Sequence, residues 1–557
     1  MGINLHDKEL EELRSLLKMG EGTNVEFKRK LSKESLDADK RQKILARLRL
    51  MTSEGEGVLV LGVDDIRGEK WEVYGLKQGE IRSSDRTVRE LCIEAGVRVK
   101  EKKVYRTEKG LVVKYLLERE EVEVGEVISL SFAGRVNAGK STLIGVLLGG
   151  RLDDGRGGAR AYLLRHPQEL KKGQTADLHY AFIGFNAKGE VMEYEDPLSK
   201  EERARVLDEA RRIVTLIDAP GHAEYLKSMI RSILGSDSQY GAILIPAGDE
   251  YKLIVAEESR RGIARLDDIT REHMLLMTSR DTPFIIVITK IDMATYDVLE
   301  KVRSVVRRTV KEIGRVPLWV KDKEDVEVVR KEIAHKVIVP VVEVSCTTGE
   351  GLDVLKKLLY ALPVMVPDEL AYKPALAYID KVYKGIRGAN VVVTGTVKHG
   401  VFKPEQNVKV GPDADGGFRR GWIASVEVFC ERVSRVKPGE MFGFDIKRID
   451  PEVVRRGQVV ADVDMELTAC REFWARIVVT RHPTRITVGY SPVLHCNTIS
   501  QTVVFEEIKG KEYLSVGDHA EVRLRLKYRP EYITVGDRIV TREGTTRTIG
   551  RVTEIIE

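Results

Sequence analysis

Residues 134–142 read GRVNAGKST, and this stretch decides the fold of the middle of the chain. An apolar run at 127–133 precedes it and predicts a strand, and the pattern at 142–148 predicts the start of a helix. Glycines at such a turn let backbone N–H groups surround a phosphate, while the start of the helix favours negative charge. The sequence therefore predicts a phosphate-binding loop in a mainly parallel α/β sheet.

The same loop offers the groups that hold a nucleoside triphosphate and its metal. We expect the Lys140 ammonium to reach the β- and γ-phosphates and the Ser141 hydroxyl to bind Mg²⁺. A chance glycine-rich turn is the alternative, and the flanking strand and helix patterns disfavour it. The predicted nucleotide contacts of the loop are Asn137, Ala138, Gly139, Lys140, Ser141 and Thr142.

Two further motifs are predicted to respond to the γ-phosphate. Residues 218–222 read DAPGH after an apolar run, and we expect Asp218 to hold Mg²⁺ through a water and the Gly221 N–H to bond the γ-phosphate. Residues 171–175 read KKGQT, and the hydroxyl of Thr175 is expected to complete the Mg²⁺ shell. Loops that are ordered by the γ-phosphate and released on hydrolysis form a nucleotide switch.

The base is predicted to be guanine. Residue Asp292 ends the sequence TKID after a buried-strand pattern, and its carboxylate accepts from the N1–H and 2-amino groups, which adenine does not offer at those places. Lys290 is expected to lie over the ring. Thr289 stands where Asn is usual, so its supporting contact is left open. Ser345 and Cys346 are expected to support the carboxylate and to offer a backbone N–H to guanine O6. GTP or GDP with Mg²⁺ is therefore the predicted ligand.

Composition indicates a multidomain protein without membrane contact. The chain has 557 residues, 42% of them hydrophobic, and no apolar run approaches the roughly 18 residues of a membrane span. Its five cysteines show no C-x-x-C spacing, so neither a zinc site nor a disulfide framework is predicted. The net charge is only +5, so any nucleic-acid surface must be local. We expect a cytoplasmic monomer.

Changes along the chain in the pattern of apolar, glycine and proline residues predict four domains. Residues 125–366 alternate apolar strands with helical stretches, as in a P-loop α/β domain. Short strands with glycine turns follow a proline-flanked linker and predict two antiparallel β-barrels, at 367–464 and 465–557. Residues 1–124 predict a small α+β domain of uncertain role. Within it, residues 57–63 predict one buried strand. Residues 26–28 (EFK) and 61–65 (LGVDD) resemble the Schlafen/AlbA-like nucleic-acid-associated fold, and the alternative is an interaction module without chemistry of its own.

With these motifs in this order, residues 125–557 resemble the elongation factor Tu/1-alpha class of translational GTPases. The stretches 134–149, 151–157 and 165–175 are similar to the GTP-binding protein 1/2 branch, in an archaeal version. The resemblance implies an enzyme that hydrolyses GTP on the ribosome. It also implies that His222 is the catalytic residue that orients the attacking water.

The resemblance further implies contacts with tRNA. In the first barrel, Asp380 and Tyr383 match a strand that receives the aminoacyl end. In the second barrel, the implied T-stem contacts are Arg529, Arg542, Glu543 and Gly544. Independently of the family, residues 522–529 alternate apolar and basic side chains. One face is expected to present four positive charges to solvent or phosphate, and a merely solvated face is the alternative.

These inferences favour a ribosome-associated GTPase that binds tRNA, aminoacyl-tRNA above all, in elongation or in the rescue of stalled ribosomes. The alternative is a GTP-switched scaffold that recruits RNA-decay or quality-control proteins without tRNA delivery. A GTPase subunit of the sulfate-activation type is a third, weaker possibility. Asn137 adds K⁺ as a candidate metal, because it creates the G-x-x-N-x-G-K-S pattern of potassium-activated GTPases. The alternative for Asn137 is hydrogen bonding within the loop.

Overall fold

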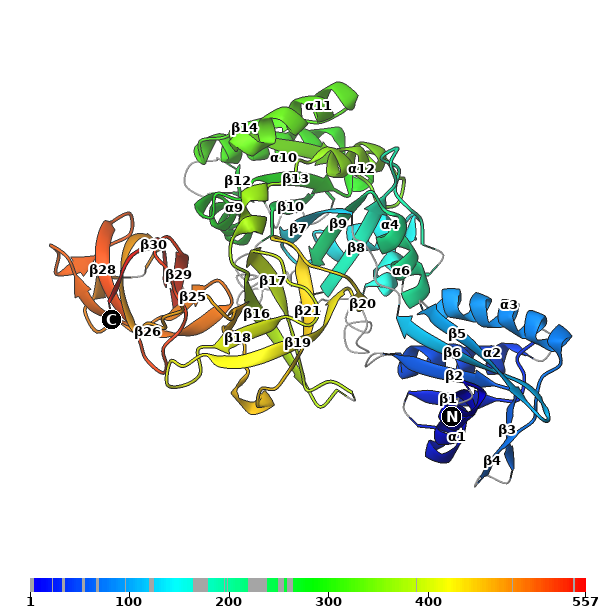
Figure 1. The fold of residues 1–557 in the computed structure, drawn as a ribbon. Coiled ribbons are helices and arrows are strands. Elements are labelled where there is room, and N and C mark those ends of the chain that lie inside the picture. Colours follow the sequence, from blue (N-terminus) through cyan, green and yellow to red (C-terminus); the bar gives the residue numbers. More distant parts are fainter. Residues whose placement is uncertain are drawn as a thin grey trace. The chain divides into compact units, whose positions relative to one another are not determined.

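The computed structural model divides the chain into two compact units, Met1–Val122 and Glu123–Glu557, which are described separately. Figure 1 labels most of their elements. The structure describes residues 5–22, 24–32, 36–52, 56–66, 70–95, 97–119, 125–163, 179–194, 196–197, 199–218, 238–248, 255–257, 264–386, 388–482, 484–543 and 546–556. None of the helices in these ranges has the length and hydropathy that a membrane crossing needs.

The first unit is an α+β fold with a four-stranded sheet in the order β1-β2-β6-β5. Neighbouring residues of a strand point to opposite faces, and the sheet buries a core on each face. Leu59 and Val113 pack with α2 and α3, whereas Val60 and Val112 pack with α1. The elements are α1 (Leu5–Met19), β1 (Val25–Lys28), α2 (Ala38–Met51), β2 (Gly57–Leu61), β3 (Val63–Ile66), β4 (Lys70–Val73), α3 (Gln78–Ala95), β5 (Val97–Thr107) and β6 (Gly110–Arg119).

The single strand expected at 57–63 is broken at Gly62. This glycine has a φ of +93°, and a Cβ on it would lie 2.8 Å from the carbonyl oxygen of Leu111. The backbone therefore leaves the sheet after β2, and β3 pairs instead with β4 as a separate hairpin.

The second unit begins with a seven-stranded sheet in the order β14-β15-β13-β10-β7-β9-β8. All its neighbouring strands are parallel except the edge strand β8, which runs antiparallel to β9. Every residue of β10 and β13 is buried, as expected of strands covered on both faces. Helices α9 and α10 share a core with one face, and α4 and α12 contact β9.

The strands of this sheet are β7 (Glu126–Gly134), β8 (His179–Phe185), β9 (Arg212–Asp218), β10 (Tyr240–Pro246), β13 (Phe284–Thr289), β14 (Val316–Trp319) and β15 (Ile338–Glu343). The helices are α4 (Lys140–Gly149), α6 (Lys200–Glu209), α9 (Asp268–Ser279), α10 (Tyr296–Glu312), α11 (Lys323–Glu332) and α12 (Leu352–Ala361). The short strands β11 (Val255–Glu257) and β12 (Ala264–Leu266) form a hairpin.

Two antiparallel barrels follow the sheet. In the first, β18-β22-β16-β17-β21-β19 close on themselves because β19 pairs again with β18, and β20 extends β19. Its strands are β16 (Leu376–Lys384), β17 (Val391–His399), β18 (Asn407–Gly411), β19 (Arg419–Val428), β20 (Glu431–Arg432), β21 (Met441–Lys447) and β22 (Val459–Asp462).

The second barrel closes in the order β23-β28-β26-β25-β29-β30. Alternate residues of its strands are buried, as along β28. Its strands are β23 (Glu472–Arg481), β24 (Ile486–Thr487), β25 (Val493–Cys496), β26 (Ile499–Ile508), β27 (Tyr513–Leu514), β28 (His519–Leu526), β29 (Arg538–Glu543) and β30 (Thr546–Ile556). The predicted fold class, a P-loop α/β domain followed by two antiparallel barrels and preceded by an α+β region, is confirmed.

Candidate functional site

The phosphate loop connects the end of β7 to the start of α4. Gly134, Asn137 and Gly139 all have positive φ, at 152°, 63° and 86°. A Cβ on Gly134 would lie 2.8 Å from the carbonyl oxygen of Leu244 in β10, so this turn requires glycine. Alternation of right- and left-handed residues turns successive N–H groups toward one side, which makes a concave site for an anion.

Lys140, the first residue of α4, is buried at the inner side of this loop. Its ammonium donates to the carbonyl oxygens of Gly134 and Arg135, both at 3.0 Å. Burial lowers the pKa of Lys140, and the nearby Asp218 carboxylate opposes that shift. A phosphate group in the loop would supply the negative charge that a desolvated ammonium favours.

Two of the predicted Mg²⁺ ligands lie together beside the loop. The Ser141 hydroxyl donates to Oδ2 of Asp218 at 2.7 Å. Parallel pairing of β7 with β9 places Asp218 beside Phe132, at the edge of the sheet where the loop begins. Hydroxyl and carboxylate oxygens are hard ligands, and Mg²⁺ typically takes one or two carboxylates, waters and substrate phosphates. The residues therefore fit the ion.

Three predicted residues of this site, Thr175, Gly221 and His222, lie outside the described residues. Their roles stay predictions. In the part of the chain that the structure describes, no group of three or more His, Cys, Asp or Glu side chains is placed to hold a metal. A Mg²⁺ ion that takes most of its ligands from phosphate and water needs no such group.

The base-recognition motif is tied to the phosphate loop by Thr289. Its buried hydroxyl donates to the carbonyl oxygen of Ala138 at 2.8 Å. The sequence left the contact of Thr289 open, and the structure shows that it links the base-recognition loop to the phosphate loop. Lys290 follows in a left-handed conformation, with a φ of 59°, and Asp292 lies in the next 3-10 turn.

Asp292 is held by Thr347, which the sequence reasoning did not select as a site residue. The Thr347 hydroxyl donates to Oδ2 of Asp292 at 2.9 Å. Ser345 in turn accepts the backbone N–H groups of Thr347 and Thr348 on its hydroxyl oxygen, at 3.3 and 3.0 Å. These bonds fix the orientation of the carboxylate that is predicted to read guanine.

A second residue that the sequence reasoning missed is Asp153, in the segment after α4. Its backbone N–H donates to the carbonyl oxygen of Cys346 at 2.8 Å. Its buried carboxylate accepts the N–H groups of Gly155, Gly157 and Ala159, each at 3.0 Å. An Asp followed by glycines two and four residues later is a signal for such a turn.

The Cys346 thiol of the base-recognition loop is neutral. Burial, with Asp153 and Asp292 nearby, raises its pKa to about 12.

In the first barrel, Asp380 is the extra residue of a β-bulge. Ile379 pairs with Gly395 and Lys381 with Thr394, which leaves Asp380 without an opposite residue. Its carboxylate pairs with Arg456 at 2.7 Å and accepts from the Tyr180 hydroxyl of β8 at 3.5 Å. Asp380 thus lies at the border with the α/β domain. Tyr383, on the same strand, is 43% exposed.

The second barrel corrects one expectation. The basic face of 522–529 is largely neutralised, because Arg523 pairs with Glu472 at 3.2 Å and Arg525 with Glu506 at 2.6 Å. Lys527 is exposed, and Arg529 keeps part of its side chain in solvent. The acidic partners come from other strands, and the alternation within one strand does not reveal them.

The remaining predicted residues of this barrel lie at the β29–β30 turn. Arg542 is half-buried, and burial lowers its pKa. Glu543 is exposed at the end of β29. Gly544 lies outside the described residues. The structure therefore links Ser141 with Asp218, Thr289 with the phosphate loop and Asp292 with Thr347, and it distributes the predicted barrel residues over both barrels.

Comparison with family models agrees with this geometry. Residues 125–368 match the elongation factor Tu GTP binding domain, and residues 466–556 match the elongation factor Tu C-terminal domain. The fold and the site define a GTPase of the elongation factor type.

Relatives extend the match to almost the whole chain. GTP-binding protein 2 of Homo sapiens is 30% identical over 548 residues, which cover 96% of this chain and 87% of the relative. Elongation factor 1-alpha of Nanoarchaeum equitans is 30% identical over 412 residues, covering 71% and 84%. The chain belongs to the elongation factor Tu/1-alpha-like GTPases and is 30% identical to GTP-binding proteins 2 and 1 over 96% and 94% of its length. It binds GTP and is a GTPase.

Solved structures support the fold. Translation elongation factor SelB from Methanococcus maripaludis, in complex with a GTP analogue, has a TM-score of 0.52 and 20% identity, covering 78% of this chain and 80% of that one. The Ski7 GTPase-like domain of S. cerevisiae, bound to GTP, has a TM-score of 0.56 and 14% identity, covering 77% and 98%. At these identities the likeness concerns the fold.

Proposed function

We propose that this GTPase binds tRNA, above all aminoacyl-tRNA, through its two barrels and hydrolyses GTP when the ribosome triggers it. Its cellular task would be elongation or the rescue of stalled ribosomes. The supporting observation is the position of Asp380, which contacts Tyr180 of the nucleotide-binding domain and Arg456 of its own barrel. A tRNA end bound at Asp380 would contact both the nucleotide-binding domain and the first barrel. Its affinity would therefore depend on the arrangement of the two domains when GTP is bound.

We further propose that Ser141, Asp218 and Thr175 hold Mg²⁺ beside the GTP phosphates. The ion would neutralise charge on the β- and γ-phosphates. Lys140 and the loop N–H groups would bind the same phosphates, and Gly221 would bond the γ-phosphate. His222 would orient the attacking water.

The test is GTP hydrolysis with ribosomes, without ribosomes, and with added aminoacyl-tRNA. Ribosomes are expected to accelerate turnover, and His222→Ala is expected to lower the accelerated rate by roughly 10²-fold while leaving GTP binding intact, the scale of a lost water-positioning group. Lys140→Ala is the contrasting variant, because it should weaken nucleotide binding itself. A lack of stimulation by ribosomes in the unmodified protein would contradict the proposal.

A GTP-switched scaffold is the second candidate. The observation that favours it is the first unit, which has its own sheet and two cores and so forms a separate surface for a partner. The two candidates differ in one outcome. Delivery of tRNA requires GTP-dependent binding of aminoacyl-tRNA, whereas the scaffold hydrolyses GTP without it.

A further inference from the structure

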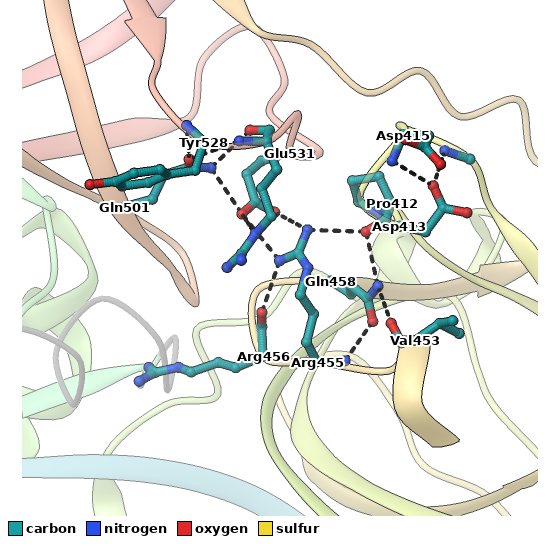
Figure 2. Close-up of polar contacts among 12 residues, drawn as sticks. Pro412, Asp413, Asp415, Val453, Arg455, Arg456, Gln458, Gln501, Tyr528 and Glu531 are labelled. Atoms are coloured by element: carbon teal, nitrogen blue, oxygen red, sulfur yellow. Dashed lines mark hydrogen bonds and ion pairs between the residues drawn. The ribbon is translucent and has the colours of Figure 1, made fainter. Parts of the chain in front are cut away.

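A buried carboxylate connects the two barrels in Figure 2. Glu531, in the segment after β28, is only 1% exposed. Its backbone N–H and C=O pair with those of Cys470, at 3.1 and 3.0 Å, and so fix it within the second barrel. Its side chain crosses to the first barrel, where Arg455 binds both carboxylate oxygens at 3.1 and 2.9 Å.

Arg455 is fixed on its own side of this junction. The same guanidinium donates to the carbonyl oxygen of Pro412 at 3.0 Å, and Gln458 donates to that oxygen at 2.9 Å. Gln458 also accepts the backbone N–H of Arg455 at 2.8 Å. The planar fork of an arginine matches a carboxylate in one orientation, so this pair sets the angle between the barrels as well as their distance.

Glu531 has two further partners within its own barrel. Gln501 donates to Oε1 at 3.0 Å, and Nε of Arg529 donates to the same oxygen at 3.2 Å. All the groups around the carboxylate are donors, as an ionised acceptor requires. Burial raises the pKa of Glu531, and the two guanidinium groups oppose that shift. The two guanidinium groups therefore stabilise the negative charge of Glu531. Removing them would leave this carboxylate buried and unpaired.

Arg529 is held in one orientation by the same cluster. Gln501 accepts its backbone N–H at 3.4 Å and donates to its carbonyl oxygen at 3.0 Å. With Nε bound to Glu531, the side chain remains 39% exposed. In the described part of the chain its terminal nitrogens make no hydrogen bond. The preceding Tyr528 is 63% exposed and Lys527 is exposed beside it.

We propose that Glu531 is a positioning residue for RNA binding at the junction of the barrels. Its carboxylate fixes the first barrel against the second and holds the Nε edge of Arg529, so that the terminal N–H groups point outward as a preset fork for an RNA phosphate. Tyr528 and Lys527 extend this surface with an aromatic face and a second charge. This inference rests on the proposed function, because it assumes that the barrels bind tRNA.

The experiment is a double-mutant cycle on the full chain, measuring tRNA affinity in the GTP form at several salt concentrations. Arg529→Ala is expected to weaken binding roughly tenfold and to lower the salt slope by about one unit, as for one lost phosphate contact. Glu531→Gln is expected to weaken binding by a similar factor, because the guanidinium loses its fixed orientation. In the Arg529→Ala background, the effect of Glu531→Gln should be clearly smaller, because only the contact of Glu531 with Arg455 is then lost.

Controls separate this role from a loss of fold or of the nucleotide site. GTP affinity should stay unchanged in both variants. Glu521→Gln, which removes a half-buried carboxylate of β28 that pairs with Lys509, is the matched control and should leave tRNA affinity unchanged. Arg455→Lys keeps the charge but removes the fork, so it should weaken tRNA binding, and it should do so more strongly when Arg529 is present.

Additive effects of Glu531→Gln and Arg529→Ala, with tRNA bound by the unmodified protein, would overturn the inference and leave the proposed function standing. If Glu531→Gln does not fold, additivity between Arg455→Lys and Arg529→Ala would overturn it instead. Absence of any tRNA binding by the unmodified protein would overturn both the inference and the proposed function.

Discussion

Thr289 ties base recognition to phosphate binding through one hydrogen bond to Ala138. The sequence motif usually has Asn at this position, and a hydroxyl is shorter than an amide. The shorter side chain still reaches the phosphate loop because β13 and the loop approach each other closely: Thr289 Oγ1 lies 3.6 Å from where a Cβ on Gly139 would be. A single residue thus couples the two ends of the nucleotide site.

We predict that Thr289→Val weakens GTP and GDP binding by a similar factor. Valine keeps the shape but leaves the Ala138 carbonyl oxygen unsatisfied, which costs about 1–3 kcal/mol of stability. The phosphate loop is then no longer fixed against β13, so we expect nucleotide affinity to fall roughly tenfold, or by about 1.4 kcal/mol. Titration of a fluorescent guanine nucleotide would measure it. Unchanged affinity would show that this hydrogen bond does not contribute.

Asp292 is the residue predicted to select guanine, and the Thr347 hydroxyl donates to its carboxylate. Asp292→Asn is expected to weaken GTP and to favour xanthosine triphosphate, because an amide donates to the 2-oxo group of xanthine. Competition between the two nucleotides measures the shift. Thr347→Val should lower GTP affinity without creating a preference for xanthine. Equal affinity of the unmodified protein for ATP and GTP would contradict the assignment of this motif.

Asn137 is exposed in the phosphate loop, in a left-handed conformation. With GTP bound, an amide oxygen there would face the region between the β- and γ-phosphates, where charge grows as the bond breaks. We predict that K⁺ raises GTP hydrolysis above the rate in Na⁺ at equal ionic strength and that Asn137→Ala removes the difference. Equal rates in the two salts would exclude a contribution from the ion.

Among the elements, α9 connects the nucleotide site to the second barrel. Its buried His273 lies close enough to Lys140 for the ammonium to help lower the histidine pKa. Its neighbour Glu272 pairs with Arg547 of β30, and Asp268 at its start lies 3.7 Å from Arg481 of β23. One helix therefore packs on β7, the strand that leads into the phosphate loop, and also pairs with the second barrel.

His273 makes this helix sensitive to acid. Burial, with Lys140 as a smaller cause, lowers its pKa from 6.5 to about 3. The unfolded chain binds a proton below pH 6.5 and the folded chain does not, so stability is lost as the pH falls. Between pH 6.5 and 5 the loss is about 2 kcal/mol. Urea unfolding at the two pH values measures it, and His273→Gln should reduce the pH dependence; an equal dependence in that variant would contradict the assignment.

The strands also show how much of the fold can be predicted from the sequence. Apolar periodicity predicted β7, β9 and β13 to within a residue or two, because strands buried on both faces are continuous apolar runs. It did not predict the bulge at Asp380 or the break at Gly62, since both depend on what the neighbouring strand offers. Of the site, the phosphate and base motifs were predicted. The bond of Thr347 to Asp292 and that of the Asp153 N–H to Cys346 were not, because each joins residues far apart in the chain.

On the scale of the whole molecule, the GTPase domain and both barrels form one compact unit. Contacts that bind them together join residues far apart in sequence, such as Tyr180 with Asp380 and Arg455 with Glu531. Spacing within single motifs cannot reveal such pairs. Because of these contacts, the domains of the proposed tRNA surface are physically connected to the nucleotide site. The bound nucleotide can therefore influence RNA binding.

The most direct test of this account is protection of the aminoacyl ester. Aminoacyl-tRNA would be incubated with the full-length protein in its GTP-analogue form and in its GDP form, and hydrolysis of the ester would be followed over time. We predict clear slowing with the GTP analogue and little or none with GDP, because in the proposed function the barrels hold the acceptor end only when the γ-phosphate is bound. Equal rates of ester hydrolysis with the GTP analogue, with GDP and without protein would contradict the account.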